Sequence, residues 1–215
     1  SRPAEADPRR LFEAFRDYAC TNLFASPALI DKLGRYCVDQ DLQLTSLRRA
    51  ISAGAPASNP ALERFQQCLP DGIEVLTSYG ATEALPVSLL GSREILRETR
   101  QLTDQGGGVC VGRPTPGIQV RVVPIHDEPI ESWTEDLPLL QGEIGEIVVR
   151  GVLVTPSYYR RPQVTKLAKI PTVDGDAWHR MGDVGYLDEQ GRLWMCGRKS
   201  HLVDAERGTM YTIPC

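Results

Sequence analysis

The chain has 215 residues, of which 41% are hydrophobic and 24% are charged, and its formal net charge is −4. This composition is typical of a globular protein long enough to bury a core. The acidic balance argues against a basic surface for nucleic acid, and no run of about 18 apolar residues could span a membrane. The opening stretch SRPAEADPRRLFEAF lacks the apolar centre of a signal peptide, so we expect a cytoplasmic protein.

Six cysteines and three histidines are the soft and borderline metal ligands of this chain, but their spacing argues against a zinc site. No two cysteines form the C-x-x-C pair that such sites commonly use. We therefore expect reduced and mostly buried thiols, as in cytosolic proteins. The sequence stops on YTIPC, ending at Cys215, and this ending indicates a segment of a longer protein.

Helix signals alternate with short apolar runs over residues 8–80. Asp7, Ser26 and Asn59 each precede a proline, an arrangement that favours a helix start. Helices are predicted over residues 7–19, 26–38 and 59–69, and strands over residues 20–26, 47–52 and 72–80. An alternation of this kind predicts parallel strands joined by helical crossovers.

Two stretches of small and polar residues follow neighbouring predicted strands. SAGAPAS covers residues 52–58, and TSYGATEA covers residues 77–84. Ligands of parallel α/β sheets bind beyond the carboxyl ends of the strands. We therefore expect the two stretches to lie side by side at one edge of the sheet.

The pattern changes after about residue 105, where glycine and proline turns separate short alternating runs. Residues 185–198 predict a hairpin with DEQG as its turn, and residues 126–141 predict an exposed acidic loop. This half of the chain predicts a small antiparallel sheet or β-barrel. The expected fold class is therefore α/β, with a parallel α/β layer followed by that small antiparallel β-barrel.

Side chains in the two polar stretches suit a nucleotide. Gly54 and Ala55 leave the backbone open to a flat ring, and Tyr79 offers a face on which an aromatic base can stack. Thr82 offers a hydroxyl to a phosphate oxygen, and Glu83 offers a hard oxygen ligand to Mg²⁺. The alternatives are an ordinary strand-to-helix turn at SAGAPAS and an ordinary loop with Glu83 in solvent.

A second pair of polar residues lies at the start and at the end of the predicted hairpin. The carboxylate of Asp183, between glycine residues in HRMGDVGYLD, can accept two hydrogen bonds from a vicinal diol such as a ribose. Arg198, at the end of the hairpin, can donate to a ribose or a phosphate. The alternatives are a turn-forming aspartate and a surface arginine.

Four ordered segments resemble motifs of the adenylate-forming superfamily, which contains acyl-CoA synthetases, peptide-synthetase adenylation domains and luciferases. SLRRAISAGAPAS resembles its Gly-Gly-Ala-Pro stretch, and TSYGATEA resembles its Tyr-Gly-x-Thr-Glu motif. GEIGEIVVRGVLVTPSYYRRPQVT resembles its Gly-Glu-Ile…Gly-Tyr…Pro…Thr segment. WHRMGDVGYLDEQGRLWMCGR resembles its Trp-x-x-Thr-Gly-Asp…Asp-x-x-Gly…Gly-Arg segment.

The resemblance implies a role for each matching residue. Tyr79 would stack on adenine, Thr82 would touch the α-phosphate, and Asp183 would take the ribose hydroxyls with the help of Arg198. Glu83 would hold Mg²⁺, so that Thr82 and Glu83 form the catalytic pair. The implied nucleotide-contacting set is Gly54, Ala55, Pro56, Ser78, Tyr79, Gly80, Ala81, Thr82, Asp183 and Arg198.

The resemblance also implies a reaction and a position within a larger enzyme. Family members use ATP to convert a carboxylic acid into an acyl-adenylate and pass the acyl group to a second nucleophile. The Ser/Thr/Gly-rich phosphate loop of the family and its distal lysine have no match here. We therefore expect the distal part of the large N-terminal domain, without adenylating activity by itself. The expected divisions are residues 1–105 with the adenine- and phosphate-contacting loops, 106–198 with the ribose-binding aspartate, and 199–215 as the hinge and start of a C-terminal domain.

Departures from the family pattern resemble one branch. Met181 replaces a usual threonine, Ser200 replaces a usual acidic or lysine residue at the hinge, and GTMYTIPC replaces Gly-x-Arg-Ile. These features are similar to the fatty-acyl-CoA-ligase-like olefin β-lactone synthetases, in which the hydroxyl of a long-chain β-hydroxy acid displaces AMP from its own acyl group.

Other functions remain open at this point. A long-chain fatty acid–CoA ligase is the first alternative and would require CoA, whereas lactone formation would not. A non-catalytic nucleotide-binding module with the same fold is the second alternative. The partners implied are ATP or AMP and a carboxylic acid, and a larger biosynthetic assembly is compatible with the sequence.

Overall fold

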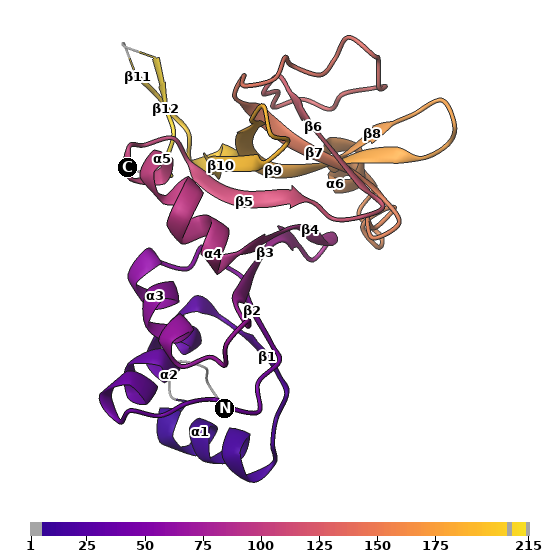
Figure 1. Ribbon diagram of the computed structural model, residues 1–215. Helices are drawn as coiled ribbons and strands as arrows, with labels where there is room; N and C mark the ends of the chain where they lie inside the picture. The colour runs from indigo at the N-terminus through magenta and orange to yellow at the C-terminus, as the bar shows by residue number, and fades with distance from the viewer. Residues whose placement is uncertain (1–5, 206–207, 214–215) are drawn as a thin grey trace. The chain divides into compact units, whose positions relative to one another are not determined.

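The structure is a computed structural model that describes residues 6–205 and 208–213 (Figure 1). The chain divides into two compact units, each described here by itself. The N-terminal unit comprises Ser1–Tyr79 and Leu90–Arg100, and the C-terminal unit comprises Gly80–Leu89 and Gln101–Cys215. The sequence-based divisions at residues 105 and 198 stay predictions.

Three helices of the N-terminal unit have a serine or aspartate as N-cap and a proline in one of their first two positions. They are α1 (Pro8–Asp17), α2 (Pro27–Asp39) and α3 (Asn59–Gln67). The Asp7 carboxylate accepts a 3.0 Å hydrogen bond from the backbone N–H of Arg9, which confirms the predicted cap. The prediction that Asn59 and Pro60 open α3 is confirmed, and Ser58 takes the extended cap conformation before them.

The strands of the N-terminal unit are β1 (Asn22–Ala25), β2 (Arg49–Ala53) and β3 (Val75–Ala81). They pair in parallel in the order β1-β2-β3, as the alternation of helices and strands predicts. Ala53 at the end of β2 is the register partner of Ser78 in β3. The predicted juxtaposition of the two polar stretches is therefore confirmed where they leave these strands.

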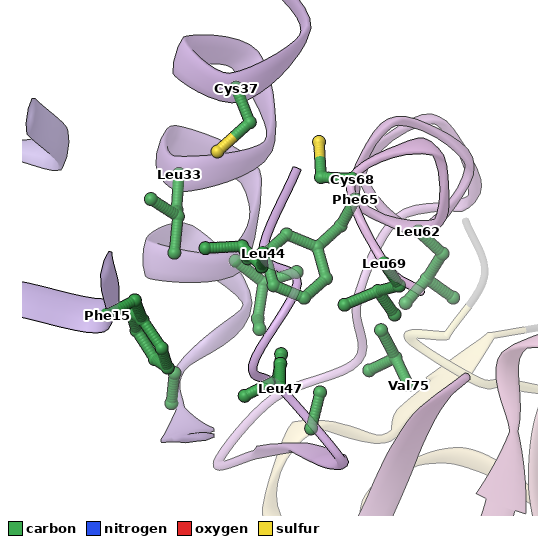
Figure 2. Packing of buried hydrophobic residues seen from close by; sticks show 13 residues of the cluster. Phe15, Leu33, Cys37, Leu44, Leu47, Leu62, Phe65, Cys68, Leu69 and Val75 are labelled. Atoms are coloured by element: carbon green, nitrogen blue, oxygen red, sulfur yellow. The ribbon is translucent and has the colours of Figure 1, made fainter. Parts of the chain in front are cut away.

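The core of the N-terminal unit lies around α2 and α3, and Figure 2 shows its side chains converging. Leu33 from α2 and Phe65 from α3 are fully buried. Leu47, just before β2, and Val75, the first residue of β3, are fully buried as well. Cys37 and Cys68 are also buried here as free thiols, which agrees with the expectation from the sequence. This apolar contact fixes the helices over one another, because each buried aliphatic or aromatic side chain contributes about 1.5–3 kcal/mol.

A tight turn follows β3 in place of the predicted loop. Thr82 and Glu83 form the turn, and strand β4 (Ala84–Gly91) begins directly after them. Three consecutive helical segments follow β4: α4 (Ser92–Glu94), a π-helical segment (Ile95–Thr99) and α5 (Arg100–Asp104). The turn therefore presents Thr82 and Glu83 at the tip of a strand pair.

The C-terminal unit contains an antiparallel sheet in the order β4-β5-β10-β9-β7-β6, with β8 paired to β9. Its further strands are β5 (Val109–Pro114), β6 (Ile118–Val123), β7 (Gly145–Gly151), β8 (Lys169–Pro171), β9 (Ala177–Leu187) and β10 (Leu193–Arg198). The predicted antiparallel sheet and the β9–β10 hairpin are confirmed. The sheet is open rather than a closed barrel, since no pairing among the described strands joins β6 back to β4.

Short elements complete the C-terminal unit. Helix α6 (Pro162–Ala168) precedes β8, a 3₁₀ turn (Lys199–His201) follows β10, and β11 (Val203–Ala205) pairs with β12 (Gly208–Met210) as a separate hairpin. Among the described residues, no helix is long and apolar enough to cross a membrane.

The acidic segment between β6 and β7 is irregular and mostly exposed, as the sequence predicts, but three of its apolar side chains pack against the sheet. Ile130, Trp133 and Leu137 pack against the buried cluster that contains Val148 and Trp178. Trp133 stacks on Trp178 with ring centroids 4.4 Å apart. The acidic side chains face solvent, while these apolar ones dock the segment onto the sheet.

Candidate functional site

The stretch after β2 is open on the surface of the N-terminal unit. Gly54 has φ +96°, a left-handed conformation that favours glycine, and a side chain there would meet nothing within 4 Å. Gly54, Ala55 and Pro56 are all exposed. This exposed, nearly side-chain-free backbone is accessible to a flat ring, as the sequence predicts.

Ser78 and Tyr79 lie in β3, beside the end of β2. Tyr79 is mostly buried, with 8% of its surface exposed. The burial fixes the ring and leaves only a small part of it for a ligand. Stacking of adenine on Tyr79 therefore stays a prediction, and it concerns that exposed part alone.

Gly80 and Ala81 are the last two residues of β3 and lead into the turn. A Cβ atom on Gly80 would lie 2.5 Å from the backbone oxygen of Ala84 and 2.9 Å from a methyl group of Leu85. Only glycine allows the end of β3 to approach the start of β4 this closely, because any larger residue would place its Cβ atom against Ala84 and Leu85. Thr82 is exposed at the tip, so its hydroxyl is accessible to a ligand.

Glu83 is held from two sides. The hydroxyl of Tyr158 donates a 2.7 Å hydrogen bond to Oε1 of Glu83, and the backbone N–H of Thr155 donates a 2.8 Å bond to the Glu83 carbonyl oxygen. The bond from Tyr158 lowers the pKa of Glu83, and nearby His179 and Lys169 lower it further. Burial and the bond to Glu83 raise the pKa of Tyr158 to about 12. At neutral pH the pair is therefore a carboxylate and a neutral phenol.

This carboxylate fits the chemistry of Mg²⁺. Mg²⁺ takes one or two protein carboxylates and completes its octahedral shell with phosphate oxygens and water. Glu83 is ionised and only partly buried, and its second oxygen, Oε2, is a further acceptor. No group of three or more His, Cys, Asp or Glu ligands occurs among the described residues, so a site here would need phosphate oxygens as well.

Two buried basic residues lie behind Glu83. Lys169 in β8 and His179 in β9 are register partners, and both are almost fully buried. Burial lowers the pKa of Lys169, and burial together with the positive charge of Lys169 lowers the pKa of His179 to about 4. His179 Nδ1 lies 3.2 Å from the Ala168 carbonyl oxygen, which suits a neutral ring that donates from Nδ1. Neither residue is among those predicted from the sequence to be functional.

Asp183 and Arg198 are brought together as the sequence predicts. They are register partners in the β9–β10 hairpin, and Arg198 Nε lies 3.1 Å from Asp183 Oδ1. Met181, Gly182 and Asp183 stand opposite the single residue Ile147, so β9 bulges at this point. Gly182 has φ +66°, which accommodates the bulge.

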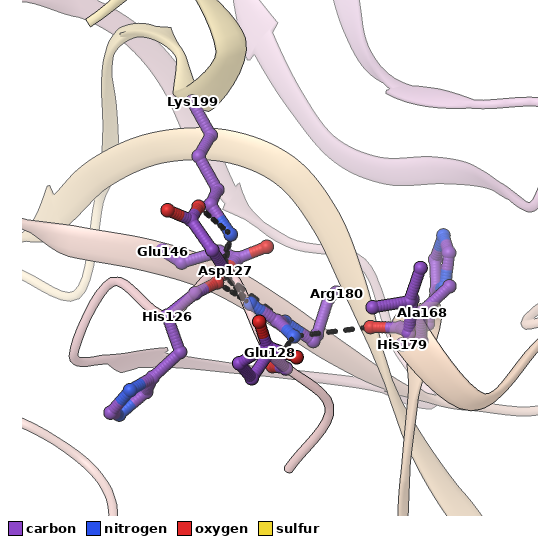
Figure 3. A network of polar contacts seen from close by, with 9 residues as sticks. His126, Asp127, Glu128, Glu146, Ala168, His179, Arg180 and Lys199 are labelled. Atoms are coloured by element: carbon purple, nitrogen blue, oxygen red, sulfur yellow. Dashed lines mark hydrogen bonds and ion pairs between the residues drawn. The ribbon is translucent and has the colours of Figure 1, made fainter. Parts of the chain in front are cut away.

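A buried ionic network lies near this bulge (Figure 3). Arg180 Nη2 and Nε donate to Oε2 of Glu146 over 2.6 and 3.1 Å, and both side chains are almost fully buried. Lys199 Nζ lies 3.7 Å from the same Glu146 oxygen and 3.2 Å from Asp127 Oδ1. Arg180 also donates to the carbonyl oxygens of His126, Glu128 and Leu167. This network ties the β6–β7 segment to β9 and to the turn after β10.

An open pocket of about 480 Å³ adjoins the network within the C-terminal unit. Gly182 and Arg198, the neighbours of Asp183 in sequence and in space, line it. The full lining is Asp127, Glu146, Val164, Leu167, Ala168, Arg180, Gly182, Arg198, Lys199 and Ser200. Arg198 of the predicted ribose-binding pair therefore lines a hollow in the size range of small-molecule sites, and Asp183 lies next to two of its lining residues.

The predicted residues separate by unit. Gly54, Ala55, Pro56, Ser78 and Tyr79 belong to the N-terminal unit, and Gly80, Ala81, Thr82, Glu83, Asp183 and Arg198 belong to the C-terminal unit. Sequence reasoning missed Tyr158, although it lies in the segment that resembles the Gly-Tyr…Pro…Thr motif. It also missed Glu146, which lies in the same matching segment, and Arg180, which lies in the segment that begins at Trp178.

These features define a class of protein. Residues 1–159 match the family described as AMP-binding enzyme, so the chain belongs to that family. Two curated relatives are both described as "Olefin beta-lactone synthetase". The protein from Stenotrophomonas maltophilia strain K279a is 44% identical over 216 aligned residues, and the protein from Xanthomonas campestris pv. campestris is 42% identical over 216.

The alignments cover nearly all of this chain but only part of each relative. The alignments include 99% of this chain but 38% of each relative, so the chain spans well under half of their length. Among solved structures, an amide bond synthetase, McbA from Marinactinospora thermotolerans, superposes with a TM-score of 0.75 at 26% identity. That superposition covers 96% of this chain and 37% of McbA. The fold is therefore that of the corresponding part of adenylate-forming enzymes.

Proposed function

We propose that the protein is an ATP-dependent adenylate-forming ligase that activates a long-chain β-hydroxy fatty acid and closes it to a β-lactone in olefin biosynthesis. The observation that carries the nucleotide part is the pairing of buried Asp183 with Arg198, which lines an open pocket. The identity of 44% to a relative described as an olefin β-lactone synthetase supports the choice of product. Soluble partners, ATP and the acid, suffice for this reaction, and a cytoplasmic location is part of the proposal.

In the first step, a carboxylate oxygen of the acid attacks the α-phosphorus of ATP. The new P–O bond forms the acyl-adenylate while the bond to pyrophosphate breaks. Thr82, at the exposed tip of its turn, would donate to an α-phosphate oxygen, and Asp183 would accept from the ribose hydroxyls. Mg²⁺ held by Glu83 would neutralise phosphate charge as it develops. The protein thereby brings together two anions that repel each other in water.

In the second step, the β-hydroxyl oxygen attacks the acyl carbon of the adenylate. The hydroxyl loses its proton to solvent, the new C–O bond closes a four-membered ring, and AMP leaves with the electron pair of the broken bond. Activation is needed because hydroxide is a poor leaving group and AMP is a good one. CoA takes no part in this reaction.

The test uses the full-length protein with ATP, Mg²⁺ and a long-chain β-hydroxy acid, with and without CoA. We expect pyrophosphate, AMP and a β-lactone in the absence of CoA, detected by phosphate assay, chromatography and infrared absorption of the lactone carbonyl. The matched acid without its β-hydroxyl should still support the exchange of labelled pyrophosphate into ATP, which reports adenylation, but it should yield no lactone.

Three results would contradict the proposal in different ways. Strict dependence on CoA, with a thioester product, would identify a long-chain fatty acid–CoA ligase. ATP binding without pyrophosphate exchange would identify a non-catalytic nucleotide-binding module. Absence of ATP binding would remove the nucleotide assignment itself.

A further inference from the structure

The segment from Val154 to Tyr158 contacts Glu83 at both its backbone and its carboxylate. Val154 forms an antiparallel bridge with Ala84, and the Thr155 N–H donates to the Glu83 carbonyl oxygen over 2.8 Å. Three residues later, the Tyr158 hydroxyl donates to Glu83 Oε1 over 2.7 Å. One short segment therefore holds both the backbone and the carboxylate group of Glu83.

The same segment is anchored to the helix and strand that follow it. The backbone N–H of Tyr158 donates to Oγ1 of Thr165 in α6 over 3.0 Å. Lys169 in β8 donates from Nζ to the carbonyl oxygen of Thr155. Since Lys169 is almost fully buried, this anchor is shielded from water. The Tyr158 hydroxyl is thus presented to Glu83 from a firmly held backbone.

Fixing the carboxylate matters because free glutamate is flexible. A glutamate side chain that becomes ordered loses about 1.5–2 kcal/mol of rotamer entropy. Mg²⁺ demands near-octahedral geometry, so a carboxylate that is already aimed loses less on binding. Hydrogen bonds from outer residues to ligating carboxylates commonly serve this purpose. Tyr158 occupies Oε1 and leaves Oε2 as the oxygen for the cation.

We propose that Tyr158 is a positioning residue, which aims the Glu83 carboxylate at a divalent cation bound with the nucleotide. This inference rests on the proposed function, because it assigns Glu83 to the cation. It adds to that function a second residue, 75 positions away in sequence, whose hydroxyl sets the cation affinity.

The test compares Tyr158→Phe with Tyr159→Phe in the full-length protein. The two changes remove the same atom from adjacent residues, but Tyr159 is 82% exposed, and its ring centroid lies 5.1 Å from the guanidinium carbon of Arg160. Binding of Mn²⁺ in the presence of ATP is measured by electron paramagnetic resonance. Pyrophosphate release is measured against Mg²⁺ concentration.

We expect Tyr158→Phe to weaken Mn²⁺ binding and raise the KM for Mg²⁺ by about tenfold, within the range for outer-residue changes at metal sites. The kcat at saturating Mg²⁺ should stay within about twofold, because the cation then fills the site despite the looser carboxylate. Tyr159→Phe should match the wild type in both measurements.

Unchanged Mn²⁺ affinity in Tyr158→Phe, or an equal loss of affinity in both variants, would overturn the inference. The proposed function would still stand in that case, provided that the wild-type protein releases pyrophosphate. If Tyr158→Phe does not fold, Thr165→Val removes the acceptor of the Tyr158 N–H and should weaken Mn²⁺ binding in the same direction. Wild-type Mn²⁺ affinity in Thr165→Val would then overturn it. A wild-type protein that binds no Mn²⁺ with ATP would remove the proposed function and the inference together.

Discussion

Arg198 and Asp183 face each other across the β9–β10 ladder, with Nε 3.1 Å from Oδ1. The aspartate side chain is 3% exposed, while the arginine side chain is 52% exposed. The carboxylate is therefore shielded from water, and its cationic partner reaches it from the solvent side. A diol that hydrogen-bonds to this carboxylate would gain more than the same diol in water, because few water molecules compete there.

Asp183→Asn is expected to weaken AMP binding by about 10- to 100-fold, because a hydrogen bond to a charged group contributes about 1.5–3 kcal/mol. Isothermal titration of AMP into the full-length protein measures the change. Asp136→Asn, which removes the same charge from an exposed position in the β6–β7 segment, is the control. Equal AMP affinity in wild type and Asp183→Asn would exclude Asp183 from the nucleotide site.

Glu83→Gln is expected to reduce Mg²⁺-dependent pyrophosphate exchange on the order of 100-fold. The amide keeps the shape of the side chain and can still accept from Tyr158, but it lacks the charge that holds a hard cation. Thermal unfolding should be unchanged, which separates loss of the cation from loss of fold. Glu189→Gln, in the exposed hairpin turn, should exchange pyrophosphate like the wild type. Near-normal exchange in Glu83→Gln would rule out the metal role.

Glu146→Gln is expected to lower the free energy of unfolding by about 3–5 kcal/mol, because Arg180 would keep a buried charge without its counter-ion. Urea denaturation followed by circular dichroism measures the loss. Glu135→Gln, in an exposed position of the β6–β7 segment, should change the free energy by less than about 0.5 kcal/mol. A loss below about 1 kcal/mol in Glu146→Gln would show that the three carbonyl acceptors of Arg180 are sufficient.

The stability of the fold is expected to fall between about pH 6.5 and pH 4 because His179 is buried and neutral. In that range the unfolded chain binds a proton at His179, whose ordinary pKa is 6.5, whereas the folded chain does not, since its pKa is about 4. When only the unfolded state binds a proton, the free energy of unfolding rises with pH. Lowering the pH from 6.5 to 4 therefore removes the stability that neutral His179 contributes. The contribution is on the order of 3 kcal/mol.

His179→Gln tests this dependence, since glutamine can donate to the Ala168 carbonyl oxygen and does not titrate. Unfolding temperatures from pH 4 to pH 7 should show a flatter profile than those of the wild type. His201→Gln changes an exposed histidine and should leave the profile as it is. A wild-type slope in His179→Gln would assign the acid sensitivity to other groups.

The sequence predicted the parallel half of the fold well because local signals agree there. A proline in the first two positions, after a serine or aspartate cap, marks each helix start, and the apolar runs between the helices are too short for anything but strands. β4 escaped prediction because it contains Pro86, and a proline within an apolar run argues against a strand. Whether the antiparallel sheet closes into a barrel or stays open could not be predicted either, because closure depends on strand tilt and stagger rather than on residue pattern.

The site could be predicted where a motif is continuous in sequence. Thr82 and Glu83 share a turn, and Asp183 and Arg198 share a hairpin, so their proximity follows from local structure. Tyr158 reaches Glu83 only through the folding of the Val154–Tyr158 segment onto the turn. No periodicity or composition signals a contact of that kind.

The stacked indoles of Trp133 and Trp178 are a built-in optical probe. Two such rings at 4.4 Å couple their electronic transitions, so the near-ultraviolet circular dichroism of the protein should carry a signal specific to this pair. Trp133→Phe would assign that signal. Lifting of the acidic segment from the sheet would then be visible in real time, without any label and independently of turnover.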